Sequence, residues 1–213
     1  LPDFGTQRMP APGGAPEIEF RNVSFGYGET EVLHQVSFSQ PRNTLFALVG
    51  PSGGGKTTIA NLLARFWDVQ KGSVLVRGVD VRRLPLGTLM DHISMVFQNV
   101  YLFHDTIYNN IAMGRPDASR EEVIEAAKQA RCYDFIMALP DGFDTMVGEG
   151  GANLSGGERQ RISIARCILK DAPIVILDEA TANVDADNES YIQEAISSLC
   201  RGKTLLVIAH RLN

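Results

Sequence analysis

A glycine-rich run with one lysine and two threonines has the residue types and spacing needed to hold a phosphate group. It follows the apolar segment 45–49, which we expect to be a buried strand, and contains the pattern Gly-x-x-x-x-Gly-Lys-Thr. Glycines let the backbone curl and aim successive N–H groups inward, and no Cβ blocks an anion. A helix that begins near Gly55 would add free N–H groups and the positive end of its dipole. The residues that we expect to contact a nucleotide here are Gly50, Pro51, Ser52, Gly53, Gly54, Gly55, Lys56, Thr57 and Thr58.

Two side chains of this phosphate-binding loop have separate tasks. Lys56 brings a full positive charge to the β and γ phosphates, and Thr57 supplies a hydroxyl for Mg²⁺. The alternative is a plain glycine-rich turn before a helix. The apolar strand before the loop and the helical pattern after it favour the phosphate site.

A pair of carboxylates follows a second apolar segment, 174–177. We expect Asp178 to hold Mg²⁺ beside Thr57. Glu179 is placed to orient and deprotonate an attacking water. Two acidic residues after a strand can also form an ordinary solvated loop, and the phosphate-binding loop makes that alternative the weaker one.

The segment 154–158, Leu-Ser-Gly-Gly-Glu, predicts the start of another helix. Ser155 and Glu158 have the spacing of a capping box, which is the structural alternative for this segment. Capping alone does not require two adjacent glycines, however. A serine followed by Gly156 and Gly157 at a helix start makes a second anion site.

Periodicity predicts the elements that must position these residues. Expected strands are 17–25 and 32–38, joined by a turn at 26–29, a hairpin over 72–81, and the apolar segments 45–49, 93–97, 174–177 and 204–209. Expected helices follow the phosphate-binding loop, occupy much of 106–139 with a capping box at Ser119 and Glu122, follow Glu158, and include 192–199. Strands that alternate with helices require a parallel sheet.

Composition limits the possible partners. The 213 residues have a formal net charge of −5, which argues against broad binding to nucleic acid. The three cysteines are widely spaced and form no Cys-x-x-Cys, so we expect free thiols in a reduced protein. No apolar run approaches the roughly 20 residues that cross a bilayer. Residues 1–16 contain four prolines and three glycines, so we expect a linker from an upstream region.

Taken together, from about Glu17 to the end, these motifs resemble the nucleotide-binding domain of an ATP-binding cassette (ABC) transporter. The segment 154–158 matches the signature motif of that family. The resemblance implies that two copies pair head to tail around two ATP molecules. Each ATP would use Lys56 of one chain and Ser155 and Gly157 of the other.

The resemblance assigns three further site residues. Tyr27 matches the aromatic residue that stacks on adenine, and the alternative is an ordinary turn tyrosine. Gln98 matches the glutamine that reaches Mg²⁺ and the attacking water and couples the site to the transmembrane partner; otherwise it is a polar residue at a strand end. His210 matches the histidine that contacts the γ-phosphate and holds Glu179 in line, although a lone histidine is usually structural. The remaining histidines, His34, His92 and His104, have no such context.

Two segments resemble the exporter branch of the family. They are 178–181, Asp-Glu-Ala-Thr, and 147–149, Val-Gly-Glu. The surrounding stretch 145–150 matches the element that touches the transmembrane coupling helices. One departure follows Thr181, where Ala-Asn-Val-Asp replaces the usual Ser-Ala-Leu-Asp; Asp185 is retained, so we expect its contact across the dimer to persist.

The expected fold is an α/β P-loop NTPase core with a mixed or parallel sheet. Residues 17–213 would form the ATPase domain, with an N-terminal antiparallel β subdomain and an inserted α-helical subdomain at about 99–169. The expected function is hydrolysis of ATP with Mg²⁺ to drive an exporter at the cytoplasmic face of the cell membrane. Expected partners are a second nucleotide-binding domain and a transmembrane domain fused upstream, and no nucleic acid is expected.

Two other functions are consistent with parts of the sequence. One is a non-hydrolysing regulatory subunit of an asymmetric pair, which Glu179 and His210 argue against. The other is a soluble ABC ATPase that acts on nucleic acid or ribosomes. The exporter-like segment 147–149 and the absence of a basic extension oppose it.

Overall fold

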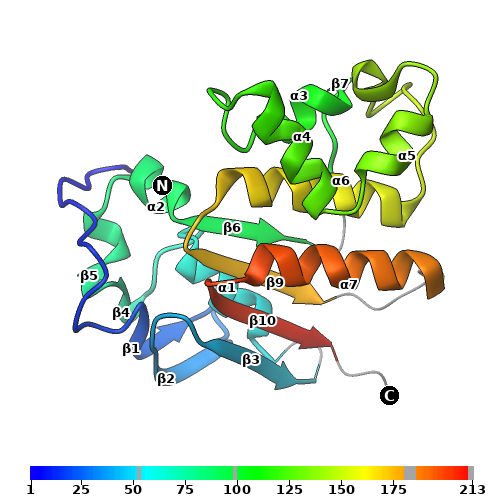
Figure 1. Ribbon diagram of the computed structural model, residues 1–213. Coiled ribbons are helices and arrows are strands. Elements are labelled where there is room, and N and C mark those ends of the chain that lie inside the picture. Colours follow the sequence, from blue (N-terminus) through cyan, green and yellow to red (C-terminus); the bar gives the residue numbers. More distant parts are fainter. Residues whose placement is uncertain (52–53, 98–99, 180–185, 211–213) are drawn as a thin grey trace. The chain divides into compact units, whose positions relative to one another are not determined.

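The computed structural model describes residues 1–51, 54–97, 100–179 and 186–210 of the chain (Figure 1). They form two units, which are described separately. The first comprises the described residues of Leu1–Ser94, Pro173–Glu179 and Gly202–Asn213. The second comprises those of Met95–Ala172 and Ala180–Arg201.

The first unit contains an antiparallel sheet with strand order β2-β1-β4-β5. Its strands are β1 (Ile18–Phe25), β2 (Leu33–Gln40), β4 (Lys71–Val76) and β5 (Val79–Asp80). Ile18 and Phe20, two residues apart on β1, are buried, and a register shift after Phe20 precedes the buried Val23. Phe20 pairs with Phe38 on β2, and their rings stack at a centroid distance of 4.8 Å. The expected strand pair and the expected hairpin over 72–81 are both confirmed.

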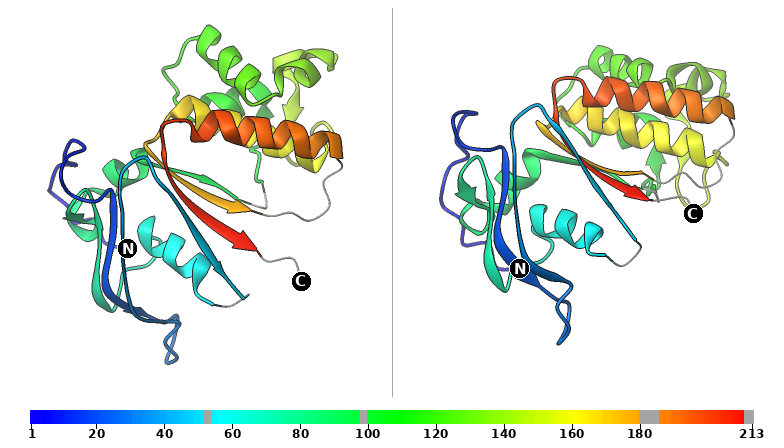
Figure 2. Two further views of the ribbon diagram at one scale, coloured as in Figure 1. Left: turned by 60° about the horizontal axis from the view of Figure 1, so that its bottom comes forward. Right: turned by 90° about the horizontal axis from the view of Figure 1, so that it is seen from below.

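A parallel sheet has the strand order β3-β10-β9-β6. Its strands are β3 (Leu45–Gly50), β10 (Thr204–His210), β9 (Ile174–Glu179) and β6 (Ile93–Val96). Helix α1 (Lys56–Leu63) follows β3, and a short helical turn η1 (Val81–Arg83) and helix α2 (Leu86–Asp91) precede β6. Figure 2 shows β10 and β9 running side by side in the same direction.

The expectation that 45–49 is a buried strand is wrong. Leu45 is 62 % and Val49 is 53 % exposed. Exposed and half-buried residues alternate along β3, so one face of this strand is uncovered among the described residues. Strand order alone is not the reason, because β6 stands at the opposite edge of the sheet and is mostly buried. An apolar run does not encode which faces of a strand other elements cover.

The second unit is mainly helical. Its elements are β7 (Asp105–Thr106), α3 (Ile107–Ala112), α4 (Arg120–Gln129), α5 (Tyr133–Ala138), η2 (Gly142–Asp144), β8 (Met146–Val147), α6 (Gly156–Lys170) and α7 (Ala186–Cys200). The two longest helices, α6 and α7, lie side by side in every view (Figures 1 and 2). Because α7 packs on α6, this unit extends beyond the expected helical subdomain at 99–169.

The N-terminal segment, residues 1–16, has no helix or strand but is attached to the first unit. Four hydrogen bonds between described residues hold it: the Gln7 N–H to the Arg83 carbonyl at 2.9 Å, Arg65 Nη2 to the Pro2 carbonyl at 3.1 Å, the Leu86 N–H to Asp3 Oδ1 at 3.1 Å, and Arg77 Nη1 to the Pro10 carbonyl at 3.0 Å. Gly5 lies so close to Leu84 that an added Cβ would stand 2.1 Å from the Leu84 oxygen. The expected linker is therefore bound to the first unit by contacts at positions from Pro2 to Pro10.

Across the described ranges, no helix has the combination of length and apolar composition that a membrane span requires.

Candidate nucleotide-binding site

The phosphate-binding loop ends in a helix start with unused donors. Gly55 is the N-cap of α1 and has a φ of 89°, and no side chain caps this helix end. The positive φ favours glycine at position 55, whereas an added Cβ would stand 2.6 Å from Leu33 Cδ2, the end of a side chain that can shift. No side chain therefore uses the first N–H groups of α1, and the anion site at this helix start stays a prediction.

The charged and hydroxyl groups of the loop lie on the first turn of α1. Lys56 is half-buried, and its Nζ donates a hydrogen bond to the Gly50 carbonyl, so the ammonium group folds back over the loop. Thr57 is exposed, whereas Thr58 is buried. The Gly54 N–H donates to the Pro51 carbonyl at 3.1 Å. Ser52 and Gly53 lie outside the described residues.

The register of the parallel sheet brings the catalytic candidates of the first unit to one edge. His210 on β10 pairs with Gly50 on β3, and Ala209 pairs with Glu179 on β9. Because parallel strands end at the same edge of a sheet, the backbones of Glu179 and His210 stand beside the start of the phosphate-binding loop. The family resemblance implied that these residues act together, and the register gives the position of their backbones.

The metal candidates offer oxygen ligands. Asp178 lies one residue before the end of β9 and is half-buried, and Thr57 is exposed at the start of α1. A hydroxyl and one carboxylate, completed by phosphate oxygens and water, suit Mg²⁺, which seldom occupies an all-protein cage. Among the described residues there is no group of three or more His, Cys, Asp or Glu side chains able to hold a metal. Gln98, the third metal candidate, lies outside the described residues.

The Tyr27 side chain is tied to the helix that carries the phosphate site. Its hydroxyl lies 3.1 Å from Thr58 Oγ1 and accepts a hydrogen bond from Asn61 Nδ2 at 3.2 Å. The side chain remains 49 % exposed. This geometry keeps a flat ring at the surface beside α1, as a residue that stacks on a base requires.

Sequence reasoning missed three residues that hold Tyr27. They are Asn61, Gln70 and Trp67. The Gln70 side-chain amide bridges both backbone groups of Gly26, donating to its carbonyl at 2.8 Å and accepting from its N–H at 3.2 Å. The Trp67 ring lies edge-on to that of Tyr27, with 5.3 Å between centroids. All three follow the phosphate-binding loop within 14 residues of Lys56, which is the only signal that could have singled them out.

The signature segment of the second unit begins α6 with a complete capping box. Ser155 Oγ accepts from the Glu158 N–H at 3.1 Å, and Glu158 Oε1 accepts from the Ser155 N–H at 2.9 Å. The structural alternative for this segment is therefore confirmed. It does not exclude anion binding, because the Ser155 hydroxyl can still donate its own hydrogen. Gly156 is exposed, and an added Cβ there would meet nothing within 4 Å.

A buried cation supports this helix start. The Arg161 guanidinium is 5 % exposed, donates to the Arg131 carbonyl, and lies over the rings of Phe135 and Tyr191 at 4.9 and 5.0 Å. Its Nε also approaches the Gly157 carbonyl at 3.4 Å. Burial lowers the pKa of this guanidinium. The arrangement links the first turn of α6 to α5 and α7 within the second unit.

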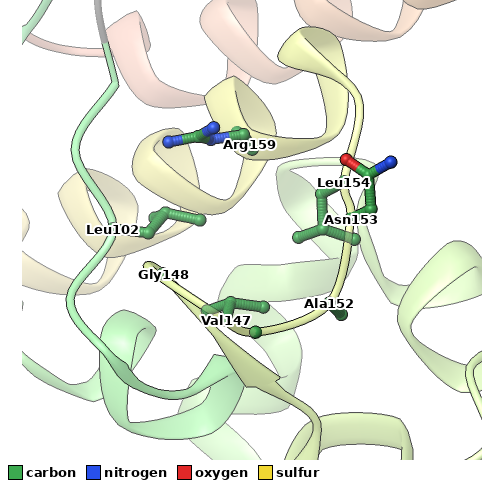
Figure 3. Close-up of a pocket in the computed structure, with 8 residues that line it drawn as sticks. Leu102, Val147, Gly148, Ala152, Asn153, Leu154 and Arg159 are labelled. Carbon is green, nitrogen blue, oxygen red and sulfur yellow. The ribbon is translucent and has the colours of Figure 1, made fainter.

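A pocket of about 320 Å³ lies against the signature helix (Figure 3). Its lining residues are Leu102, Val147, Gly148, Gly151, Ala152, Asn153, Leu154 and Arg159. The exporter-like segment 147–149 forms part of this wall, where Gly148 has a φ of 90° and packs against the His104 backbone. Close to it in sequence, Tyr101 is 70 % and Met146 is 43 % exposed.

These features define a P-loop nucleotide-binding domain of α/β architecture. A glycine-capped helix start, a carboxylate at the end of a parallel strand and a second capped helix start with two glycines occur in one chain. The family model described as ABC transporter matches residues 33–182. The chain belongs to the ABC transporter family, as a nucleotide-binding domain of the exporter type with the ABC ATPase fold.

Curated relatives agree with this assignment. The chain is 54 % identical over 198 residues to the ATP-dependent lipid A-core flippase of Legionella pneumophila (strain Paris), which covers 92 % of this chain and 34 % of that protein. It is 50 % identical over 214 residues to the flippase of the same name from Haemophilus influenzae, and the match covers 99 % of this chain and 36 % of that protein. A third relative, from Bacillus subtilis (strain 168), is named provisionally as a multidrug export ATP-binding/permease protein. It is 50 % identical over 198 residues, and the match covers 92 % of this chain and 34 % of that protein.

A solved structure shows the same fold. A bacterial Atm1-family ABC exporter with ATP bound superimposes with a TM-score of 0.84 at 46 % identity, covering 92 % of this chain and 35 % of that one. The chain thus spans about a third of the length of the relatives that it matches.

Proposed function

We propose that this chain binds ATP with Mg²⁺ and hydrolyses it, and that the cycle powers a membrane exporter. The observation that carries the proposal is the sheet register, which brings Glu179, His210 and Gly50 to one edge. A base, a polar side chain that contacts phosphate, and a phosphate-binding loop are the parts that attack by water on a γ-phosphate requires.

Each residue has a distinct role in this proposal. Glu179 orients the attacking water and accepts its proton, and His210 holds that carboxylate and the γ-phosphate in line. Lys56 releases the Gly50 carbonyl and offsets the charge on the β and γ phosphates. Thr57, Asp178 and Gln98 hold Mg²⁺, whose charge is spread over the phosphate oxygens when it is bound.

The second anion site is proposed to act on the ATP of another copy. The Ser155 hydroxyl and the N–H groups at the start of α6 would face the γ-phosphate held by the partner's loop. A head-to-tail pair then has two composite sites, and ATP itself bridges the interface. Hydrolysis removes one bridging phosphate and loosens the pair.

Export is supported by the names of the relatives, which are two flippases and one export permease. We place the domain at the cytoplasmic face of the membrane, joined to a transmembrane domain in the same polypeptide. The exposed Tyr101 and Met146 suit contact with that domain. Relatives with different cargo names share about half of their residues with this chain, so the proposal ends at export and names no cargo.

Glu179→Gln tests the proposed hydrolysis. Amide substitution removes the base but keeps the shape of the side chain, so ATP binding should persist while steady-state phosphate release falls about 100-fold or more. The matched control is Glu121→Gln, because Glu121 is exposed on the first turn of α4 in the other unit. Its turnover should equal that of the native chain.

Equal turnover in Glu179→Gln and the native chain would contradict the assigned role. A native chain that binds ATP without releasing phosphate would instead support the regulatory alternative. Release that depends on added RNA or ribosomes would support the second alternative.

A further inference from the structure

Three aromatic rings form one cluster in the first unit. The aromatic cluster consists of Phe25, Tyr27 and Trp67. Tyr27 is edge-on to both neighbours, at 5.0 Å and 90° from Phe25 and at 5.3 Å and 83° from Trp67. Phe25 is buried, whereas Tyr27 and Trp67 are 49 % and 47 % exposed. Edge-to-face pairs fix the tilt of a ring because the positive edge of one ring meets the negative face of the other.

The cluster is attached to the helix that begins at the phosphate-binding loop. The Tyr27 hydroxyl is bonded to Thr58 and Asn61, in the first two turns of α1. Trp67 comes four residues after Leu63, where α1 ends. Hydrogen bonds fix one end of the Tyr27 side chain and ring contacts fix its tilt, so an exposed ring stands at a defined angle beside the triphosphate site.

We propose that Trp67 is a positioning residue for the nucleobase: it holds the Tyr27 ring in the orientation that stacks on the base of a bound nucleotide. The inference deepens the proposed function and rests on it. The indole is large enough to contact Tyr27 and Phe25 at once, with 6.2 Å between the Phe25 and Trp67 centroids. A smaller aliphatic side chain at position 67 would leave Tyr27 free to tilt, and stacking would lose its preorganisation.

The test separates base recognition from triphosphate recognition. The dissociation constants of ATP and of inorganic triphosphate are measured by calorimetry with excess Mg²⁺ on the 213-residue chain. In Trp67→Leu we expect ATP to bind about three- to tenfold more weakly, the factor that corresponds to one edge-to-face pair. Inorganic triphosphate should bind as it does to the native chain, because it has no base to stack.

Two further variants keep the inference falsifiable if Trp67→Leu folds poorly. Trp67→Phe retains an aromatic ring and should recover most of the affinity for ATP. Phe66→Leu is the matched control, since Phe66 is also 47 % exposed and is the preceding residue, yet lies outside the aromatic cluster. That variant should bind ATP as the native chain does.

A double variant tests whether Trp67 acts through Tyr27. Tyr27→Ala removes the stacking ring, so adding Trp67→Leu should weaken ATP binding no further. The native chain offers a direct signal as well, because Trp67 is its single tryptophan. ATP should change the emission of this indole, and inorganic triphosphate should leave it unchanged.

Two results would overturn the inference. One is unchanged affinity for ATP in Trp67→Leu. The other is an equal loss for ATP and inorganic triphosphate, which would show a structural role only. Neither result touches the proposed function, which fails separately if the native chain does not bind ATP or release phosphate.

Discussion

Burial decides the chemistry of the individual thiols. The Cys132 side chain is fully buried, and its Sγ donates to the Ala127 carbonyl at 3.3 Å. Burial disfavours the thiolate and raises the pKa of Cys132 to about 12, and burial likewise raises the pKa of Cys200 to about 11. Because the thiolate is the reactive form, both residues are packing residues rather than nucleophiles.

At pH 8 we expect iodoacetamide to modify Cys132 and Cys200 far more slowly in the native chain than in guanidinium chloride. The raised pKa values also predict stability that is fully present below about pH 9 and is lost as the pH rises toward 12, because the unfolded thiols ionise first. Mass spectrometry after timed labelling checks the rates. Equal rates for native and unfolded chain would contradict the assignment.

At the scale of elements, the start of α6 depends on residues distant in sequence. Arg161 joins the first turn of α6 to the Arg131 carbonyl and to the Phe135 and Tyr191 rings. The Arg131 guanidinium in turn lies over Tyr191 at 5.3 Å and pairs with Glu194 at 3.1 Å. This network makes α5, α6 and α7 one packed body, so the signature segment begins on a supported helix.

Arg161→Ala should lower the free energy of unfolding by about 2–4 kcal/mol, because it removes a buried side chain with its hydrogen bond to the Arg131 carbonyl and its two ring contacts. Arg159→Ala is the control on the same helix. Because Arg159 is exposed, this substitution should lower the free energy of unfolding by no more than about 0.5 kcal/mol. Urea denaturation of both variants measures the difference. A cost for Arg161→Ala as small as that of the control would refute the network.

Local patterns in the sequence predicted the elements well. The glycine-capped start of α1 and the capping boxes at Ser119 and Ser155 depend on residues within one helical turn, so their spacing is sufficient. The burial of Ile18 and Phe20, two residues apart at the start of β1, likewise follows from a local pattern. The expectation that 45–49 is buried failed because one face of β3 is left uncovered among the described residues, and no local pattern contains what packs on a strand.

At the scale of the whole molecule, the unpredicted features are contacts between distant residues. The pairing of Gly50 with His210 joins residues 160 positions apart, and the aromatic cluster joins Tyr27 to Trp67. The N-terminal segment shows the same limit. Its composition is that of a linker, yet the Arg77 guanidinium donates a hydrogen bond to its Pro10 carbonyl. The same guanidinium forms a buried ion pair with Glu17, in which the Arg77 side chain is 9 % exposed and the Glu17 side chain 2 % exposed.

The central claim concerns two copies of the chain, because Lys56 and Ser155 are proposed to meet on one ATP only across a pair. Two variants divide the composite site. Lys56→Ala damages the phosphate-binding loop and leaves the signature segment intact. Ser155→Asp places a carboxylate where phosphate would lie, and aspartate still caps a helix.

The most direct test is phosphate release by an equal mixture of these two variants. Each variant alone should release little phosphate. The mixture should reach up to about a quarter of the native rate, since half of randomly assorted pairs are mixed and each mixed pair has one intact site of two. A mixture that stays as inactive as its parents, while the native chain hydrolyses ATP, would contradict the composite site.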